Sequence, residues 1–425
     1  MAEPMKITAR FFARSILLST AFVLTTICTL TLATVQPASA QTYQVIYNFS
    51  GEFAGANPQN GLTVDRGENL YGVTVSGGLQ DCALLSECGV VFELSRRSFS
   101  GWVLSGGYAF HGYDGACPAG EVAIGADGAV YGTTEFGGPG QQASCAEGEG
   151  YGVVYRVRRP TNVTGQWTET VLHAFTGGAD GRNPTGPVVF DAEGNLYLTT
   201  TVGGINNNGV VAEFTPGQGD WTESVLYSFT GGSDGGYPIG GVTFDHTGNI
   251  YGTAGSSQGS QVFQLTLSNG VWTKNTLHQF EHGVNGELIF DPSGNLYGTT
   301  GGGYDSSTVF MLSPAGAGWD YSVIYSFEGP TGCGPAAGVI MDAAGKLYGT
   351  TFCDGAYQRG SVFKLTPSGG GWTYTSLHDF TGGSDGGFPY DRLAFDVNRN
   401  LYGTASSGGT GCYYDDCGVI FEITP

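Results

Sequence analysis

A tyrosine-centred motif recurs seven times along the chain and constrains its fold more than any other feature. Its fullest form is the stretch 291–300, in which a D-x-x-G-N turn precedes the run L-Y-G-T-T. Neighbouring copies are 46 to 66 residues apart. A period of this length, built from short β-branched and aromatic runs, is typical of a β-propeller. The central tyrosines are Tyr71, Tyr131, Tyr197, Tyr251, Tyr297, Tyr348 and Tyr402.

Each copy divides into four predicted strands, which we name A to D in chain order. In the fourth copy they cover 241–245, 249–253, 261–266 and 272–280. Val, Ile, Thr, Tyr and Phe dominate these runs, and Gly, Asp and Ser separate them. The aspartate of each A–B turn can bond its own backbone two residues on. We therefore interpret these aspartates as turn formers rather than as catalytic or metal-binding residues.

An unpaired strand at one end of the chain matches a vacancy at the other. Residues 41–49 (QTYQVIYNF) resemble strand D (WTESVLYSF), whereas the last copy ends after its strand C at 419–424. We predict an all-β fold, a seven-bladed β-propeller of four-stranded blades spanning 41–425. Its N-terminal strand completes the last blade, so that the ring has no open edge.

The tryptophans share one register, each standing eight residues before a strand-D phenylalanine. A shared register indicates a shared packing role, most simply contact between blades. Stacking against sugars is the alternative. The six residues are Trp102, Trp167, Trp221, Trp272, Trp319 and Trp372.

Residues 1–40 have the features of a secretory signal. Lys6, Arg10 and Arg14 precede an apolar run at 16–33, and an A-S-A cleavage site follows at 38–40. An uncleaved membrane anchor is the alternative, and no later apolar run is long enough to span a bilayer. We expect a secreted, periplasmic or cell-surface monomer.

The composition bounds the partners of the mature chain. Removing residues 1–40 takes away three basic residues and one acidic residue, so the net charge changes from −21 to −23. Such a surface repels nucleic acid and anionic lipid and tolerates cations or neutral ligands such as glycans.

Eight cysteines remain after Cys28 is removed with the signal. An even number in an exported chain favours disulfides. Zinc is the alternative, but two successive C-x2-C pairs are missing. The four-strand division puts the D–A and B–C loops on one face, so cysteines in these loops can meet. The predicted pairs are Cys82–Cys88, Cys117–Cys145, Cys333–Cys353 and Cys412–Cys417.

The face formed by the D–A and B–C loops, which we call the loop face, is the predicted binding surface. It carries the long insertions, and loops on a rigid scaffold commonly carry function. A glycan or a partner protein is the expected ligand. Contact area there would come from Tyr113, Tyr237, Phe388, Tyr413 and Tyr414.

Charged residues interrupt a set of small ones at the start of strand A. The seven equivalent positions are Gly or Pro except for Glu121, Glu287 and Arg392, and Asp391 adjoins the last of these. If strand A is innermost, these residues meet at the mouth of the central channel. Two carboxylates near one cation suit acid–base chemistry or a metal, and a structural ion-pair cluster is the alternative.

The second functional hypothesis is accordingly a metal-assisted lactonase or lyase. The chain lacks a nucleophile elbow, in which G-x-S-x-G joins a strand to a helix, and an H-E-x-x-H motif, so we favour a binding role over an enzymatic one. We expect no cofactor, with calcium as the possible exception. The D–A loops repeat T-G-G-x-D-G, whose aspartates either ligate calcium or order a tight turn. These are Asp180, Asp234 and Asp385.

The unit G-x-L-x-x-D-x-x-G-N-L-Y-G-T-T-x-x-G-G…G-x-V-F-x-L stands at 286–312 and, with variations, at 338–365. It resembles the GloVer tandem-repeat family of exported bacterial proteins, of the choice-of-anchor type. The resemblance covers nearly all of 43–425 and implies an extracytoplasmic bacterial β-propeller, without assigning catalytic residues. The turn is also similar to that of calcium-dependent lactonase and lyase propellers.

Overall fold

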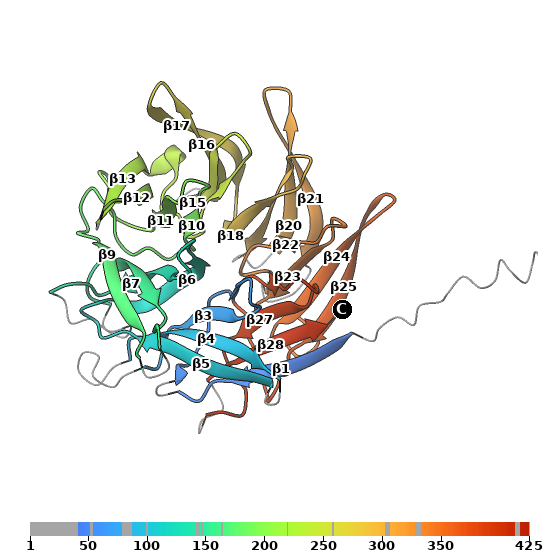
Figure 1. Ribbon diagram of the computed structural model, residues 1–425. Helices are drawn as coiled ribbons and strands as arrows, with labels where there is room; N and C mark the ends of the chain where they lie inside the picture. The colour runs from blue at the N-terminus through green and yellow to red at the C-terminus, as the bar shows by residue number, and fades with distance from the viewer. Residues whose placement is uncertain are drawn as a thin grey trace, which may run out of the picture. The chain divides into compact units, whose positions relative to one another are not determined.

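Seven four-stranded antiparallel sheets follow one another as the blades of a propeller in the computed structural model (Figure 1). The propeller unit spans Thr42–Thr424. Within the described residues, no helix combines the length and apolar character needed to cross a membrane. The predicted signal lies outside them. The structure describes residues 41–51, 54–78, 87–98, 101–140, 145, 148–162, 165–218, 220–256, 259–301, 307–327, 333–412 and 417–424.

Each blade contains four consecutive strands, except that the last blade takes its fourth from the N-terminus. Blade 1 contains β2 (Thr63–Val64), β3 (Leu70–Thr74), β4 (Val90–Arg97) and β5 (Gly101–Ala109). Blade 2 contains β6 (Ala116–Ile124), β7 (Val130–Phe136), β8 (Val153–Arg158) and β9 (Thr168–Ala174). Blade 3 contains β10 (Val189–Phe190), β11 (Leu196–Thr200), β12 (Val210–Pro216) and β13 (Trp221–Ser228).

The remaining blades repeat this order, and a short 3-10 helix, η3 (Gly232–Asp234), precedes blade 4. Blades 4 to 7 contain β14 (Thr243–Phe244), β15 (Ile250–Ser256), β16 (Gly259–Ser268) and β17 (Val271–Phe280); β18 (Gly283–Phe290), β19 (Leu296–Gly301), β20 (Ser307–Ala315) and β21 (Gly318–Phe327); β22 (Ile340–Met341), β23 (Leu347–Thr351), β24 (Ser361–Ser368) and β25 (Gly371–Asp379); β26 (Ala394–Phe395), β27 (Leu401–Ala405), β28 (Val419–Thr424) and β1 (Thr42–Asn48).

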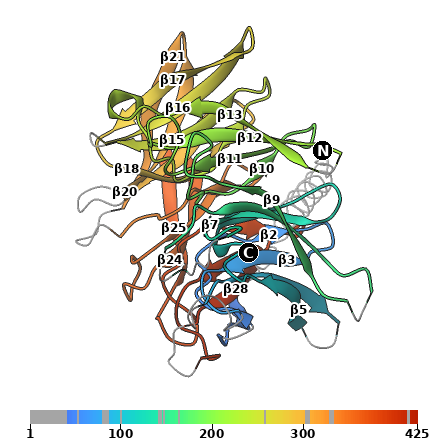
Figure 2. The ribbon, with the colours of Figure 1, turned by 90° about the vertical axis from the view of Figure 1, so that its left-hand side faces the viewer.

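The N-terminal strand closes the ring, as predicted. β1 pairs antiparallel with β28 from Thr42 opposite Thr424 to Asn48 opposite Val419. The blue N-terminal strands accordingly lie beside the red C-terminal ones in Figures 1 and 2. Phe49, just after β1, is fully buried, and its ring lies 5.2 Å from that of Phe92 in blade 1.

The glycine of the L-Y-G-T motif is explained by its partner across the sheet. In blade 1, Gly72 of strand B pairs with Phe92 of strand C, and a Cβ on Gly72 would lie 2.6 Å from the ring. Blade 3 inverts this pair, with Leu198 opposite Ala212. The large and small residues exchange strands while filling similar space, as close packing requires.

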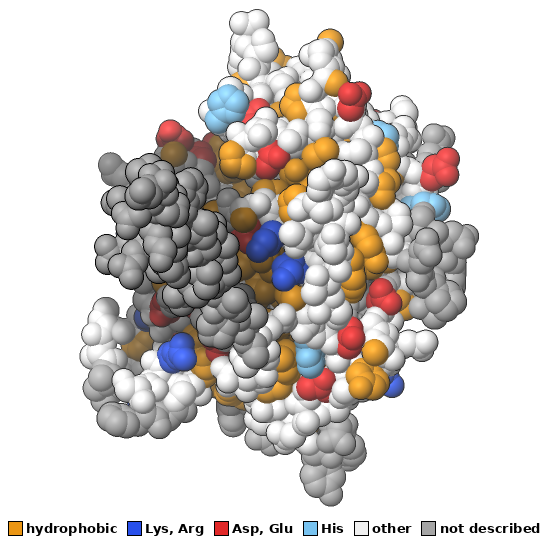
Figure 3. All heavy atoms as spheres, turned by 90° about the vertical axis from the view of Figure 1, so that its right-hand side faces the viewer, with side chains coloured by type: hydrophobic (Ala, Val, Ile, Leu, Met, Phe, Trp, Pro, Cys, Tyr) orange, Lys and Arg blue, Asp and Glu red, His pale blue; other side chains and the backbone are white. Residues whose placement is uncertain are grey.

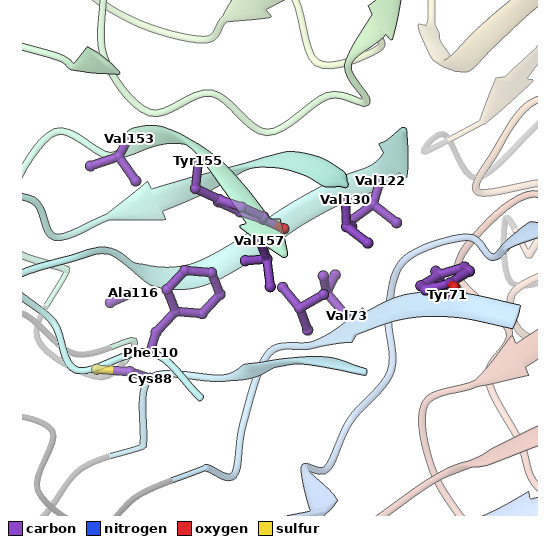
Figure 4. Close-up of a cluster of buried hydrophobic side chains, with 11 residues drawn as sticks. Tyr71, Val73, Cys88, Phe110, Ala116, Val122, Val130, Val153, Tyr155 and Val157 are labelled. Carbon is purple, nitrogen blue, oxygen red and sulfur yellow. The ribbon is translucent and has the colours of Figure 1, made fainter. Parts of the chain in front are cut away.

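The apolar core is divided among the junctions between blades. The cluster in Figure 4 joins Tyr71 and Val73 of blade 1 to Val130 and Tyr155 of blade 2. The strand-D tryptophans contribute at the same junctions, because Trp102 packs edge-on against Tyr402 of the preceding blade with ring centroids 5.7 Å apart. The prediction that the tryptophans make inter-blade contacts is confirmed where such ring contacts occur, namely for Trp102, Trp221, Trp319 and Trp372.

The A–B turn aspartates act as turn formers. Asp245 Oδ1 accepts the backbone N–H groups of Thr247 and Asn249 at 2.8 and 3.0 Å. Its Oδ2 accepts the Tyr251 hydroxyl at 2.9 Å. The motif tyrosine therefore ties strand B to the turn that starts it, which explains why aspartate and tyrosine recur together.

Three of the predicted disulfides are present: Cys117–Cys145, Cys333–Cys353 and Cys412–Cys417. The second joins a D–A loop to a B–C loop, and the first joins the start of β6 to a B–C loop, which confirms that the D–A and B–C loops share a face. Cys88 is also disulfide-bonded, whereas Cys82 lies outside the described residues. Disulfides of this kind fit an oxidising, extracytoplasmic compartment.

Ring closure predicts a specific cost at Phe49. Phe49→Ala should lower the free energy of unfolding by about 3–5 kcal/mol, as expected for a large core side chain. Urea unfolding of this variant beside Phe229→Ala, the fully buried equivalent in blade 3, provides the comparison. A negligible effect at Phe49 beside a large one at Phe229 would mean that β1 is not part of the closed ring.

Candidate functional site

The site begins with the backbone that leads into strand A. Glycines bring neighbouring blades very close there. A Cβ on Gly241 would lie 2.6 Å from Pro187 of the preceding blade, and one on Gly338 would lie 2.3 Å from the Glu287 carbonyl. A Cβ on Gly61 would lie 3.2 Å from a Glu121 carboxylate oxygen and 3.4 Å from the Arg392 carbonyl. The equivalent positions of adjacent blades therefore touch, and small residues leave room for the charged ones.

Arg392 joins the two glutamates across this mouth. Its Nη2 and Nε donate to Glu121 Oε2 at 2.7 and 3.0 Å, and Nε lies 3.9 Å from Glu287 Oε2. The three residues come from blades 7, 2 and 5, and their side chains are only 11 to 23% exposed. The convergence predicted from the repeat register is therefore present.

Asp391 adds a third carboxylate to this cluster. It accepts the backbone N–H of Gly61 through Oδ2 and that of Arg392 through Oδ1, both at 2.6 Å. Burial raises the pKa of Asp391 to about 7, and the charge of Glu287 acts in the same direction. This residue links blade 7 to blade 1 and can take up a proton near neutral pH.

The charged groups of the mouth differ in how far their neighbours compensate the cost of burying them. Burial raises the pKa of Glu121, and the guanidinium of Arg392 partly offsets this effect. Burial alone would lower the pKa of Arg392, but Glu121 and Glu287 raise it above its ordinary value. Glu287 Oε2 is buried without a hydrogen bond. Arg392 already supplies positive charge where a metal would sit between the glutamates, so the arrangement suits polar ligand contacts or proton exchange better than metal binding.

The predicted loop aromatics lie in separate D–A loops of the loop face. Tyr113 and Tyr237 are 56% and 48% exposed, and Phe388 is half-buried. Tyr413 and Tyr414 lie outside the described residues. Sequence reasoning missed Phe352 and Tyr390. The centroid of the Phe352 ring lies 5.1 Å from that of Phe388 and 4.4 Å from that of Tyr390. Alignment of the blades on the proline before strand A would have drawn attention to Tyr390, which follows Pro389 and lies two residues before the mouth position.

The D–A loop aspartates are held by their own turns. Asp385 accepts the Thr381 backbone N–H at 2.9 Å and the Thr381 hydroxyl, and lies 3.1 Å from His378 Nε2. Asp180 and Asp234 make the same two bonds to Thr176 and Thr230. These bonds give the aspartates a structural role in the turns, and the idea that they bind calcium remains a prediction.

On the face drawn in Figure 3, hydrophobic side chains are interspersed with isolated acidic ones, and basic side chains lie in a hollow near its centre. Closed blades and a charged mouth with flanking loops define this protein as a seven-bladed, disulfide-bonded β-propeller. The chain belongs to the Gloeobacter/Verrucomicrobia repeat family, whose model matches residues 142–320 and 301–425. A comparison with curated proteins found no match.

Solved structures with similar folds are distant in sequence. The extracellular domain of a B. thetaiotaomicron protein described as a hybrid two-component system has a TM-score of 0.56 and 12% identity, over 91% of this chain and 42% of that one. A family 25 polysaccharide lyase, an ulvan lyase bound to -[GlcA(1-4)Rha3S]-, has a TM-score of 0.56 and 10% identity, over 88% and 94% of the two chains. At these identities the likeness shows the fold alone.

The ion cluster predicts a non-additive mutational response. Arg392→Gln should lower the free energy of unfolding by about 3 kcal/mol, because it leaves buried carboxylates without their cation. The triple variant Glu121→Gln/Glu287→Gln/Arg392→Gln should recover most of this loss. Chemical unfolding measures both. A triple variant less stable than Arg392→Gln would contradict the proposed balance of charges.

The raised pKa of Asp391 should make the stability of the fold depend on pH, with a sign that follows from the direction of the shift. Its pKa is raised in the folded state, so the folded chain holds a proton that the unfolded chain releases above pH 3.8, its ordinary pKa. Its contribution to stability therefore falls as pH rises from 3.8 to about 7. Melting temperatures of the wild type and Asp391→Asn across this range should show a shallower decline for the variant. Parallel curves would rule out this titration.

Proposed function

We propose that this chain is an exported propeller that binds a neutral glycan at its loop face, beside the charged mouth. The observation that carries the proposal is the presence of aromatic side chains at strained backbone positions. In four D–A loops and at the start of β6, the residue before a proline that recurs in the repeat has a positive φ of 49 to 56°. Asparagine tolerates this conformation best among non-glycine residues. The five residues are Asn57, Cys117, Asn183, Tyr237 and Phe388.

Tyr237 and Phe388 occupy positions that asparagine fills in two other blades. Bulky residues in the left-handed region cost of order 1–3 kcal/mol. Tyr237 recovers little of this through packing, since 48% of its surface is exposed. Strain kept at an exposed aromatic side chain indicates a role outside the fold itself, and surface contact with a ligand is the simplest one.

A second aromatic group lies on the same face. Phe352 and Tyr390 flank one another with centroids 4.4 Å apart, and Arg359 lies over the Phe388 ring at 5.0 Å. Tyr390 is exposed and directly precedes Asp391 of the mouth. Aromatic surface beside convergent polar groups is the usual composition of a small-ligand site.

A neutral sugar matches this chemistry better than an anionic ligand. Sugar rings present apolar faces that can lie on aromatic rings, and their hydroxyls can bond Arg392 and the mouth carboxylates. The formal net charge of −21 opposes approach of anions. The Cys333–Cys353 disulfide also ties the loops of blade 6 together, which lowers the entropic cost of binding.

The test separates binding from stability at Tyr237. Tyr237→Asn should raise the free energy of unfolding by about 1 kcal/mol, because it relieves the strained backbone. The same change should weaken binding to the best ligand of a panel of neutral xylose, hexose and N-acetylglucosamine oligomers, measured by calorimetry. Leu267→Asn, on an exposed residue of the opposite end of blade 4, is the control. A panel without any binding would overturn the proposal.

A further inference from the structure

We infer that His173, Asp180 and Glu223 form a binding site for a divalent transition-metal ion at the outer junction of blades 2 and 3. His173 lies in β9, Asp180 in the following D–A loop, and Glu223 in β13 of the next blade. Each offers one ligand atom, and the three atoms lie within 4.8 Å of one another. This site is separate from the channel mouth and independent of the proposed glycan site.

The spacing of the ligand atoms matches the coordination of a small cation. His173 Nε2 lies 3.4 Å from Asp180 Oδ2 and 3.7 Å from Glu223 Oε2. Zinc bonds to nitrogen and oxygen of about 2.0–2.1 Å place tetrahedral ligands roughly 3.3 Å apart. One imidazole with two carboxylates suits zinc, manganese or cobalt better than calcium, which prefers oxygen ligands alone.

Two of the polar atoms at this junction lack any hydrogen-bond partner. These are His173 Nε2, a proposed ligand atom, and Glu223 Oε1, the second oxygen of the carboxylate whose Oε2 faces His173; both are buried without a hydrogen bond. Leaving such atoms unpaired costs free energy that a bound cation would offset. Burial lowers the pKa of His173, and the charge of Asp180 acts in the opposite direction. Burial, with the nearby charge of Asp180, raises the pKa of Glu223 to about 7, as expected where carboxylates lack a cation.

The surrounding residues hold two ligands in place. Thr176 donates its backbone N–H to Asp180 Oδ2 at 2.7 Å and its hydroxyl to Oδ1 at 2.6 Å. The His173 ring packs against Phe175 and Phe214, with centroids 4.9 and 5.3 Å away. Ligand side chains oriented by such neighbours bind metal more tightly than free ones.

At the junction of blades 3 and 4, a lysine ammonium group lies beside the equivalent aspartate. There Tyr227 donates to Asp234 at 2.7 Å, and Lys274 Nζ lies 3.5 Å from the same carboxylate. Lys274 and Glu223 are equivalent, each two residues after the strand-D tryptophan. At the junction of blades 2 and 3 a carboxylate therefore stands where blade 4 has an ammonium group, beside an equivalent aspartate. A metal ion would restore the missing positive charge.

The junction of blades 6 and 7 provides a further comparison. His378 Nε2 lies 3.1 Å from Asp385, in the arrangement of His173 and Asp180. Tyr43 occupies the place of Glu223 and stacks on the His378 ring at 3.6 Å. A histidine–aspartate pair thus recurs here without the glutamate. At the junction of blades 1 and 2 the glutamate recurs as Glu169, but Tyr108 stands in the place of His173 and donates to Asp114 at 2.5 Å. The combination of His173 with Glu223 is therefore what distinguishes the junction of blades 2 and 3.

Metal titration of the untagged mature chain tests the inference. We expect one Co²⁺ bound per chain, seen by calorimetry and by visible absorption, with competition by Zn²⁺ but not by Ca²⁺. Glu223→Lys and His173→Tyr should abolish binding, because each removes one ligand. Both should still fold, because they install residues that the fold already accepts at the equivalent positions Lys274 and Tyr227. Both variants should keep the wild-type melting temperature without metal, or exceed it.

His378→Tyr is the matched control and should bind Co²⁺ like the wild type. Absence of Co²⁺, Zn²⁺ and Mn²⁺ binding would overturn the inference. So would binding that survives in both Glu223→Lys and His173→Tyr, or binding of Ca²⁺ alone.

Discussion

The pairing of β1 with β28 is the contact on which the other features of this propeller depend. A ring of blades buries each junction only if the last blade meets the first, and here residues from opposite ends of the chain share one sheet. Closure covers the sheet edge that β28 would otherwise expose. It also sets the circumference of the ring, and with it the distance across which Arg392 reaches Glu121 and Glu287.

The repeat provides a constant backbone on which individual side chains diverge. The inward glycine and phenylalanine of strands B and C exchange places in blade 3 as Leu198 and Ala212, because the volume between blades must stay filled. Positions that face solvent or a blade junction obey no such limit. The place two residues after the strand-D tryptophan is glutamate in blade 3 and lysine in blade 4. Seven similar blades can therefore carry several different sites.

The same logic explains which interpretations of the candidate residues could be made in advance. The mouth cluster was predictable because register alone assigns Glu121, Glu287 and Arg392 to equivalent positions, and equivalent positions in a closed ring converge. The pairs Cys117–Cys145 and Cys333–Cys353 followed from the shared face of the D–A and B–C loops, and Cys412–Cys417 followed from the short spacing within one loop. The left-handed backbone at Tyr237 and Phe388 was not predictable, since a residue before proline ordinarily adopts an extended conformation.

The sequence by itself determined the number of blades, the division into strands, the closing strand and the three disulfide pairs that lie within the described residues, because each of these follows from periodicity and register along the chain. Only the tertiary structure brought His173 and Asp180 to Glu223 of the neighbouring blade, and Asp391 to the backbone of Gly61. These contacts cross between blades. Their distances depend on how twisted sheets pack side by side, and no spacing within one repeat encodes that geometry.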